Sequence, residues 1–307
     1  MMSDLETKRQ SSYTGPLFLV AAAVLWSTAG VLSKFIPWSA LSLACVRGLI
    51  AAAVQMLYSR TFRVRVTWPI LLTAVCYLGE TCLFMFANKM TSAGSAIVLQ
   101  NTLPLYIILL SLLMLRQKPS RLDLCVGAVI FAGIVLSMLD TLRGSELPGT
   151  NPALGNLLAL LSGVFYAGIF FTSRLPGANP LHSTILGNSL YVLFLPFLLR
   201  DPAVMHPATA GIPAWQSWLA VFFMGACQLG LSWICFSKGI RTTPSLQASF
   251  ITMVEPVLSP ILALIFLGEA MGLLSVVGSV LVIATIAVHN VLTEKQRQKK
   301  EAAENSS

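Results

Sequence analysis

Apolar and polar positions alternate in long blocks along this chain. Runs of about 20 mainly apolar residues, the length at which an α-helix crosses a bilayer, follow one another with short polar gaps between them. This pattern predicts about ten membrane-spanning helices. The expected spans are residues 16–36, 39–59, 68–88, 93–115, 121–141, 152–174, 181–200, 213–237, 245–267 and 272–292.

Composition supports an all-α integral membrane protein. Of 307 residues, 56% are hydrophobic and 10% charged, against about 25% charged in soluble domains. The connections are too short to hold a soluble domain. The N-terminal segment has no apolar core followed by a cleavage site, so we expect the first span to be retained. The 6 cysteines lie in apolar spans without metal-ligand spacing, so we expect neither a metal site nor a cofactor.

The placement of the positive charges predicts the topology. Of the 20 Lys and Arg residues, fifteen lie in the N-terminus, the even-numbered loops and the C-terminal tail. Only Lys34, Lys89, Arg143 and Arg200 belong to odd-numbered loops, and Arg47 lies within a span. Because cytoplasmic loops are enriched in Lys and Arg, we expect both termini in the cytoplasm. The net charge of +8 therefore indicates membrane topology and no nucleic-acid partner.

The chain also contains a weak internal repeat. Sliding the second half back by 152 positions lays Pro256 on Pro104, and a slide by 140 lays Tyr166 on Trp26. The expected units are two five-helix repeats, 1–145 and 146–293, and a charged, frayed cytoplasmic tail, 294–307. With an odd number of spans, the second repeat enters the membrane inverted. Inverted repeats are a common plan of secondary transporters, which bind their substrates near the midplane between the repeats.

Several phrases of the sequence resemble a known family. KGIRTTPSLQASFITMVEPVLSPILALIFLGE and the start LFLVAAAVLWSTAGVLSKF are similar to the EamA-type branch of the drug/metabolite transporter superfamily, over nearly the whole chain. Glu255–Pro256 and Gly268–Glu269 are its most specific pieces, whereas Arg116–Gln117 stands in the first repeat where Gly-Glu is common. The resemblance implies export of small metabolites in most members and uptake in some, without fixing a substrate.

The most informative span is the ninth, which carries Glu255, Pro256 and Pro260 near its middle. A proline inside a helix frees the carbonyl four residues earlier, here that of Thr252. An intramembrane carboxylate beside such a break marks a functional site. Burial without a basic partner favours the neutral carboxyl, so we predict that Glu255 exchanges a proton during transport, with Glu80 as the second coupling candidate. The alternative is a protonated glutamate that only supports a kink.

Arg47 and Glu80 form a second charged pair of interest. Each lies about 8 residues, or ~12 Å, from the outer end of its span, on consecutive helices. Because an isolated charge at this depth costs at least ~2.5–3.5 kcal/mol, we expect the two side chains to be in direct contact. The pair either binds a charged end of the substrate or only holds two helices together.

Amides, hydroxyls and aromatic rings inside the spans complete the candidate site. Amides and hydroxyls near the proline-broken helices offer donors and acceptors, and rings line pockets for flat or cationic solutes. The alternatives are inter-helix hydrogen bonds and core packing. The substrate-binding candidates are Trp26, Arg47, Glu80, Gln100, Asn101, Tyr166, Gln228, Trp233, Ser249 and Thr252.

These features favour a secondary active transporter that exports small neutral or zwitterionic metabolites, such as amino-acid-like solutes, by proton-coupled alternating access. A flippase for a lipid-linked carrier and an exporter of organic cations are the alternatives. No catalytic cluster and no nucleotide-binding loop is apparent, so we expect neither an enzyme nor direct use of ATP. The expected partners are a small-molecule substrate and the lipid bilayer of a bacterial-type cell membrane, with a homodimer contact assigned to the fifth and tenth helices.

Overall fold

The computed structural model describes residues 2–102, 105–106, 109, 120–142, 151–173, 175–205, 213–243, 248 and 251–304. This part of the chain is helical and contains no strand. Its elements are α1 (Met2–Ser27), α2 (Ala29–Phe35), α3 (Ala40–Ser59), α4 (Trp68–Met90), α5 (Ala93–Gln100), α7 (Arg121–Leu142), α8 (Pro152–Thr172), α9 (Pro180–Ser189), η1 (Leu190–Phe194), α10 (Leu195–Leu198), α11 (Pro202–Met205), α12 (Ala214–Phe223), η3 (Met224–Leu231), α13 (Ser232–Thr242), α15 (Val254–Leu267) and α16 (Leu273–Glu304).

The helices have the length and composition of membrane spans. Among the described residues, 8 helical segments are long and apolar enough to cross a bilayer, and Val254–Leu267 is a shorter apolar helix. The chain is therefore a multi-pass membrane protein. The expected fourth span continues beyond α5 into residues that are mostly outside the described part, including Pro104, so its proline break stays a prediction.

Side-chain caps start several helices directly after very short connections. Ser39 Oγ accepts a hydrogen bond of 3.3 Å from Ser42 N at the start of α3. Ser92 Oγ accepts one of 3.1 Å from Ser95 N at the start of α5. Each cap satisfies a backbone N–H that has no intrahelical partner. Capping lets the chain reverse direction within a few residues and keeps successive spans adjacent.

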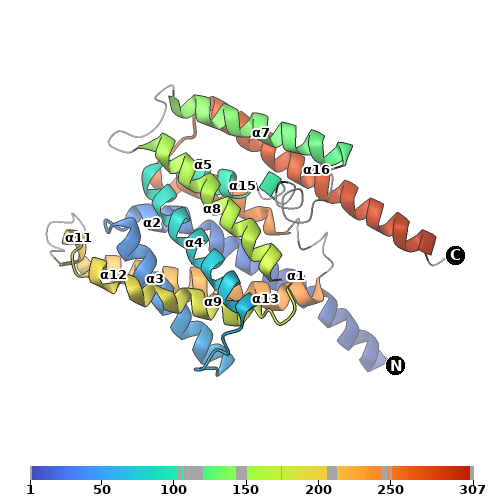
Figure 1. Cartoon of the computed structure of the whole chain (residues 1–307), viewed down its shortest axis with the longest axis horizontal. Helices are drawn as coiled ribbons and strands as arrows, with labels where there is room; N and C mark the ends of the chain where they lie inside the picture. Colours follow the sequence, from blue (N-terminus) through green and yellow to red (C-terminus); the bar gives the residue numbers. More distant parts are fainter. Residues whose placement is uncertain are drawn as a thin grey trace.

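The packing of the helices follows a two-fold plan. The α1–α13 contact has a counterpart in α8–α4, the α3–η3 contact in α9–α4, and the α5–α8 contact in α15–α1. Three further contacts join counterparts to each other, namely α7–α16, α5–α15 and α3–α9. An axis that exchanges the first five spans with the last five produces this pairing. Figure 1 shows α7 and α16 together along one edge of the bundle, away from α3, α9 and α13.

One expectation about a helix end is wrong, and one about a helix break agrees with the structure. The tail was expected to fray after residue 293, but α16 continues to Glu304, because its residues are mostly Glu, Lys, Gln, Arg and Ala, which favour helix. The ninth span is predicted to break near Pro256, and the described residues agree: residues 251–252 are helical, Met253 is a turn, and α15 begins at Val254. Pro256 lies in the first turn of α15, where its missing N–H removes no ladder bond. The junction of the two predicted repeats, 145/146, lies outside the described residues.

Candidate functional site

A cavity lies where helices of the two halves meet. The space inside it that water can occupy is about 40 Å³, which is enough for a few water molecules. Its walls come from α1, α3, α4 and the end of α5 in the first half, and from α8, η3, α13 and α15 in the second. The lining residues are Trp26, Arg47, Glu80, Thr81, Phe84, Gln100, Asn101, Tyr166, Gln228, Leu229, Trp233 and Glu255.

Arg47 supplies a buried positive charge to this cavity. Its side chain is 2% exposed. Nη1 donates to Gln228 Oε1 at 3.3 Å and Nη2 donates to the carbonyl oxygen of Thr81 at 3.3 Å. Nε is buried and has no hydrogen-bond partner among the described residues. The guanidinium is therefore held by two neutral acceptors and keeps unused donor capacity, which suits it to an anionic group on a ligand.

Glu80 is held by a different side chain from the one expected. Its Oε1 accepts a hydrogen bond from Gln100 Nε2. Among the described residues, Glu80 forms no ion pair with Arg47 within 4.0 Å; the pairs present are Lys34–Glu269 and His289–Asp123. The predicted direct contact is wrong because equal depth does not fix the direction of a side chain. Instead, each charged side chain is hydrogen-bonded by its own neutral amide: Arg47 by Gln228 and Glu80 by Gln100.

Gln228 reaches Arg47 from a π-helical segment, η3. Segments of this kind are uncommon and occur often at functional sites. The close approach of η3 to α3 depends on Gly225. A Cβ atom there would lie 2.6 Å from Ile50 Cβ and 2.8 Å from the carbonyl oxygen of Arg47. The small residue thus permits the contact that brings the Gln228 amide to the guanidinium.

An aromatic cluster forms one wall of the cavity. The rings of Trp26 and Trp233 meet edge to face with centroids 5.4 Å apart, and Tyr77 also packs edge to face on Trp233 at 5.3 Å. Trp26 comes from the first half of the chain and Trp233 from the second, so this wall crosses the boundary between them. Tyr166, the repeat counterpart of Trp26, also lines the cavity.

Glu255 lines the cavity from the first turn of α15. It is half-buried, and within the described part of the chain it makes no hydrogen bond or ion pair. A carboxylate in the first turn is favoured by the helix dipole. Among the described residues, Glu255 is therefore the acid in the cavity with the fewest hydrogen-bond partners.

Nine of the ten predicted binding residues are described, and eight of those nine line the cavity. Thr252 is the described residue that does not line it, and Ser249 lies outside the described residues. Thr81, Phe84 and Leu229 were missed. The signal for Phe84 was available, because position i+4 from Glu80 shares its side of a helix. These placements describe geometry; a role in binding stays a prediction.

Comparison with known proteins gives a consistent picture. The chain is 25% identical over 293 residues to the uncharacterized transporter YwfM of Bacillus subtilis (strain 168), covering 92% of this chain and 95% of that protein. It is 23% identical over 297 residues to the uncharacterized inner membrane transporter YicL of Salmonella typhimurium (strain LT2), covering 90% and 95%. A crystal structure with 19% sequence identity shares the fold, with a TM-score of 0.57 over 92% of this chain and 98% of the other.

The family model of the EamA-like transporters matches the chain twice, at residues 13–139 and 153–291. Each match covers one of the two five-span halves, which agrees with the two-fold packing of the helices. Together they cover most of the sequence, including every residue that lines the cavity. The chain belongs to the EamA-like transporter family.

Proposed function

We propose that this protein is a secondary active transporter that exports small neutral or zwitterionic metabolites by alternating access. The observation that carries the proposal is the cavity between the two halves, lined by charged, amide and aromatic side chains from both. Buried ionisable groups are costly in a membrane, so their concentration around one cavity is best explained by a solute that uses them. Both termini are taken to be cytoplasmic, in a bacterial-type cell membrane.

The charges in the cavity favour a zwitterion over a simple anion. Arg47 offers a guanidinium with spare donor capacity, and Glu80 and Glu255 offer two carboxyl groups. When one carboxyl is protonated the three groups sum to zero charge. A solute with one carboxylate and one ammonium then pairs with Arg47 at one end and with an acid at the other, while Trp26 and Trp233 contact its apolar part.

Glu255 is the proposed coupling residue. Without a protein partner among the described residues, it binds either a proton or the ammonium of a solute. Competition between the two at one carboxyl is enough to exchange protons for solute. Glu255→Gln mimics the protonated acid, which does not pair with an ammonium, so it is expected to weaken solute binding and to remove the response of transport to a pH gradient. If the Gln variant still concentrates solute in response to that gradient, Glu255 is not the coupling group, and Glu80 becomes the candidate.

A ligand screen tests the binding step directly. Purified protein is heated in detergent with single amino acids, amines and carboxylic acids, and a ligand at 100 times its Kd is expected to stabilise the protein by ~2.7 kcal/mol. Zwitterions should stabilise the parent protein but not Arg47→Gln. Stabilisation by amines alone, unchanged in Arg47→Gln, would support the organic-cation alternative. A response only to lipid-linked carriers would support a flippase.

A further inference from the structure

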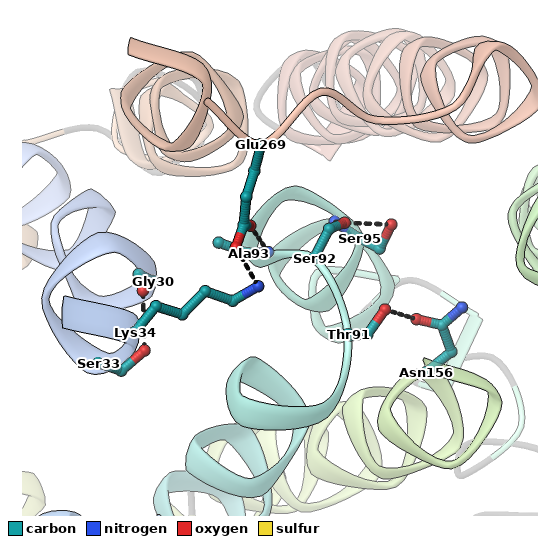
Figure 2. A network of polar contacts seen from close by, with 9 residues as sticks. All are labelled: Gly30, Ser33, Lys34, Thr91, Ser92, Ala93, Ser95, Asn156 and Glu269. Carbon is teal, nitrogen blue, oxygen red and sulfur yellow. Dashed lines mark hydrogen bonds and ion pairs between the residues drawn. The ribbon is translucent and has the colours of Figure 1, made fainter. Parts of the chain in front are cut away.

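One end of the helix bundle is closed by an ion pair outside the cavity. Lys34, at the end of α2, contacts Glu269, which directly follows the connection from α15, with Nζ and Oε1 2.6 Å apart. The two side chains are 12% and 8% exposed. Glu269 Oε2 also accepts a hydrogen bond of 3.2 Å from Ala93 N at the start of α5. Figure 2 shows the Glu269 carboxylate between the Lys34 ammonium and the N-terminus of α5.

The ion pair joins the two halves of the chain. Lys34 and Ala93 belong to the first five spans and Glu269 to the second five. The carboxylate also lies at a helix N-terminus, where the dipole favours negative charge. We call Lys34, Glu269 and the N-terminus of α5 the latch, and the end of the bundle that carries them the latch end.

The helices around the latch are also tightly packed against each other. A Cβ atom on Gly94 would lie 2.5 Å from Met271 Sδ and 3.0 Å from Pro260 Cβ. Lys89 Nζ donates to the carbonyl oxygen of Ile36 between α4 and the end of α2. The latch end therefore leaves little room for a solute to pass between the halves. The ion pair is one part of a closed barrier.

The sequence does not repeat this charge pair at the other end of the bundle. In the repeat alignment, Arg174 stands at the position of Lys34 and Gln117 at that of Glu269, both outside the described residues. A cation and a neutral amide do not make an ion pair. The repeat alignment therefore gives no counterpart of the Lys34–Glu269 ion pair at the other end of the bundle.

We propose that the latch is a gate that must open for each transport cycle and that biases the resting protein towards closure at this end. The proposal rests on the proposed function, because alternating access requires that each end open in turn. Lys34 and Glu269 are paired and largely buried only in the closed state. Separation exposes both to water, so the pair stabilises one of the two states, and its loss shifts the population towards the other.

Accessibility of a single cysteine in the cavity tests the gate. All six native cysteines are replaced, Phe84→Cys is added as reporter, and labelling by a membrane-impermeant maleimide is measured from each side of the membrane. The side that the latch end faces is defined by a second reporter, Ser145→Cys, in the connection between α7 and α8. Folding is checked by size-exclusion chromatography and by complete labelling in denaturant.

The variants separate charge from volume. Glu269→Gln still accepts the hydrogen bond from Ala93 N but loses its charge, and Lys34→Met loses only the ammonium. Each is expected to raise labelling from the latch-end side at least about fivefold. The labelling rate of Lys34→Arg should stay near that of the parent, because the positive charge is kept.

The double variant of Glu269→Gln and Lys34→Met should label no faster than the faster single variant, because both substitutions remove the same contact. Asp123→Asn, which breaks the ion pair of α7 with His289 at 3.3 Å, is the matched control and should leave labelling unchanged.

Unchanged labelling in both Glu269→Gln and Lys34→Met overturns the gate, as does an equal rise in Asp123→Asn. Labelling needs no substrate, so this failure is distinct from failure of the proposed function. The latter would appear as a parent protein that binds no solute in the thermal screen, whatever the reporter does.

Discussion

Arg47 donates a hydrogen bond of 3.3 Å to Gln228, and this bond joins the first and second halves of the chain across the cavity. The helix that carries Arg47 and the π-helical segment that carries Gln228 pack directly against each other. A rearrangement that separates the two halves at the cavity therefore has to lengthen or break this hydrogen bond. Its partners are a charge and a neutral amide, so its rupture leaves one charge to be satisfied by water or solute.

A double-mutant cycle should detect this bond. Arg47→Met and Gln228→Leu are each expected to destabilise the protein, and their combined effect should be smaller than the sum by about 0.5–3 kcal/mol. The measurement is the unfolding midpoint in detergent. A matched cycle of Arg47→Met with Glu80→Gln should give a smaller coupling, because those side chains form no ion pair among the described residues. The reverse order of couplings would contradict the observed geometry.

Gly225→Ala should disturb the same contact through the backbone. The added methyl group would lie 2.8 Å from the Arg47 carbonyl oxygen, and crowding of this kind costs about 1–3 kcal/mol. Gly127→Ala on α7 is the control, because its nearest neighbour would be Leu105 Cδ1 at 3.6 Å. That change should be neutral or stabilising, by up to about 1 kcal/mol. Equal effects of the two substitutions on the unfolding midpoint would argue against tight α3–η3 packing.

Asp201, outside the spans, gives a pH dependence. Burial raises its pKa, but hydrogen bonds from Ser42, Ser39 and Ala203 outweigh burial and bring the pKa below its usual value. The folded state therefore binds this proton less readily than the unfolded state does. The stabilisation is fully present above the unfolded pKa of about 3.9 and is lost as the pH falls through the lower folded value.

Asp201→Asn should accordingly destabilise the protein by about 2 kcal/mol at pH 7, from weakened hydrogen bonds to the Ser39 and Ala203 N–H groups. The gap between parent and variant in the unfolding midpoint should narrow as the pH falls below about 4. A gap that stays constant from pH 7 to pH 3 would show that the charge of Asp201 contributes nothing.

The sequence was sufficient for the spans and for most of the cavity. Length and hydropathy define a membrane helix without reference to its neighbours, and ionisable or amide side chains inside a span, such as Arg47 and Gln100, stand out against an apolar background. Their pairing was not predictable, since it depends on the rotation of each helix. The contact of Glu80 with Gln100 and the π-helical backbone around Gln228 follow from packing between segments far apart in the chain.

The Lys34–Glu269 contact was not predicted for a related reason. Both residues lie at span ends, where charged side chains are ordinary, and 235 positions separate them in the sequence. Only the meeting of the two halves brings the second charge to the first. The extension of α16 to Glu304 was not predicted for a different reason. It depends on helix propensity, whereas the apolar pattern was used to define the span.

Topology is tested by cysteine labelling in intact cells. Because positive charges concentrate in the even-numbered loops and the tails, Ser145→Cys should react with an impermeant reagent from outside and Ser306→Cys only after the cells are opened. Both reporters are compared in a background without native cysteines. Labelling of Ser145→Cys only from the cytoplasmic side would invert the orientation and place the latch end in the cytoplasm.

Solute movement in proteoliposomes is the most direct test of a cavity that binds zwitterions and carries them between the two sides. Vesicles preloaded with a mixture of unlabelled amino acids are given the same compounds in labelled form outside, with and without a pH gradient. The parent protein should exchange at least one zwitterionic solute faster than protein-free vesicles, and Arg47→Gln should reduce that exchange at least tenfold, about 1.4 kcal/mol. Exchange at equal rates by the parent, Arg47→Gln and protein-free vesicles would contradict the proposed transport.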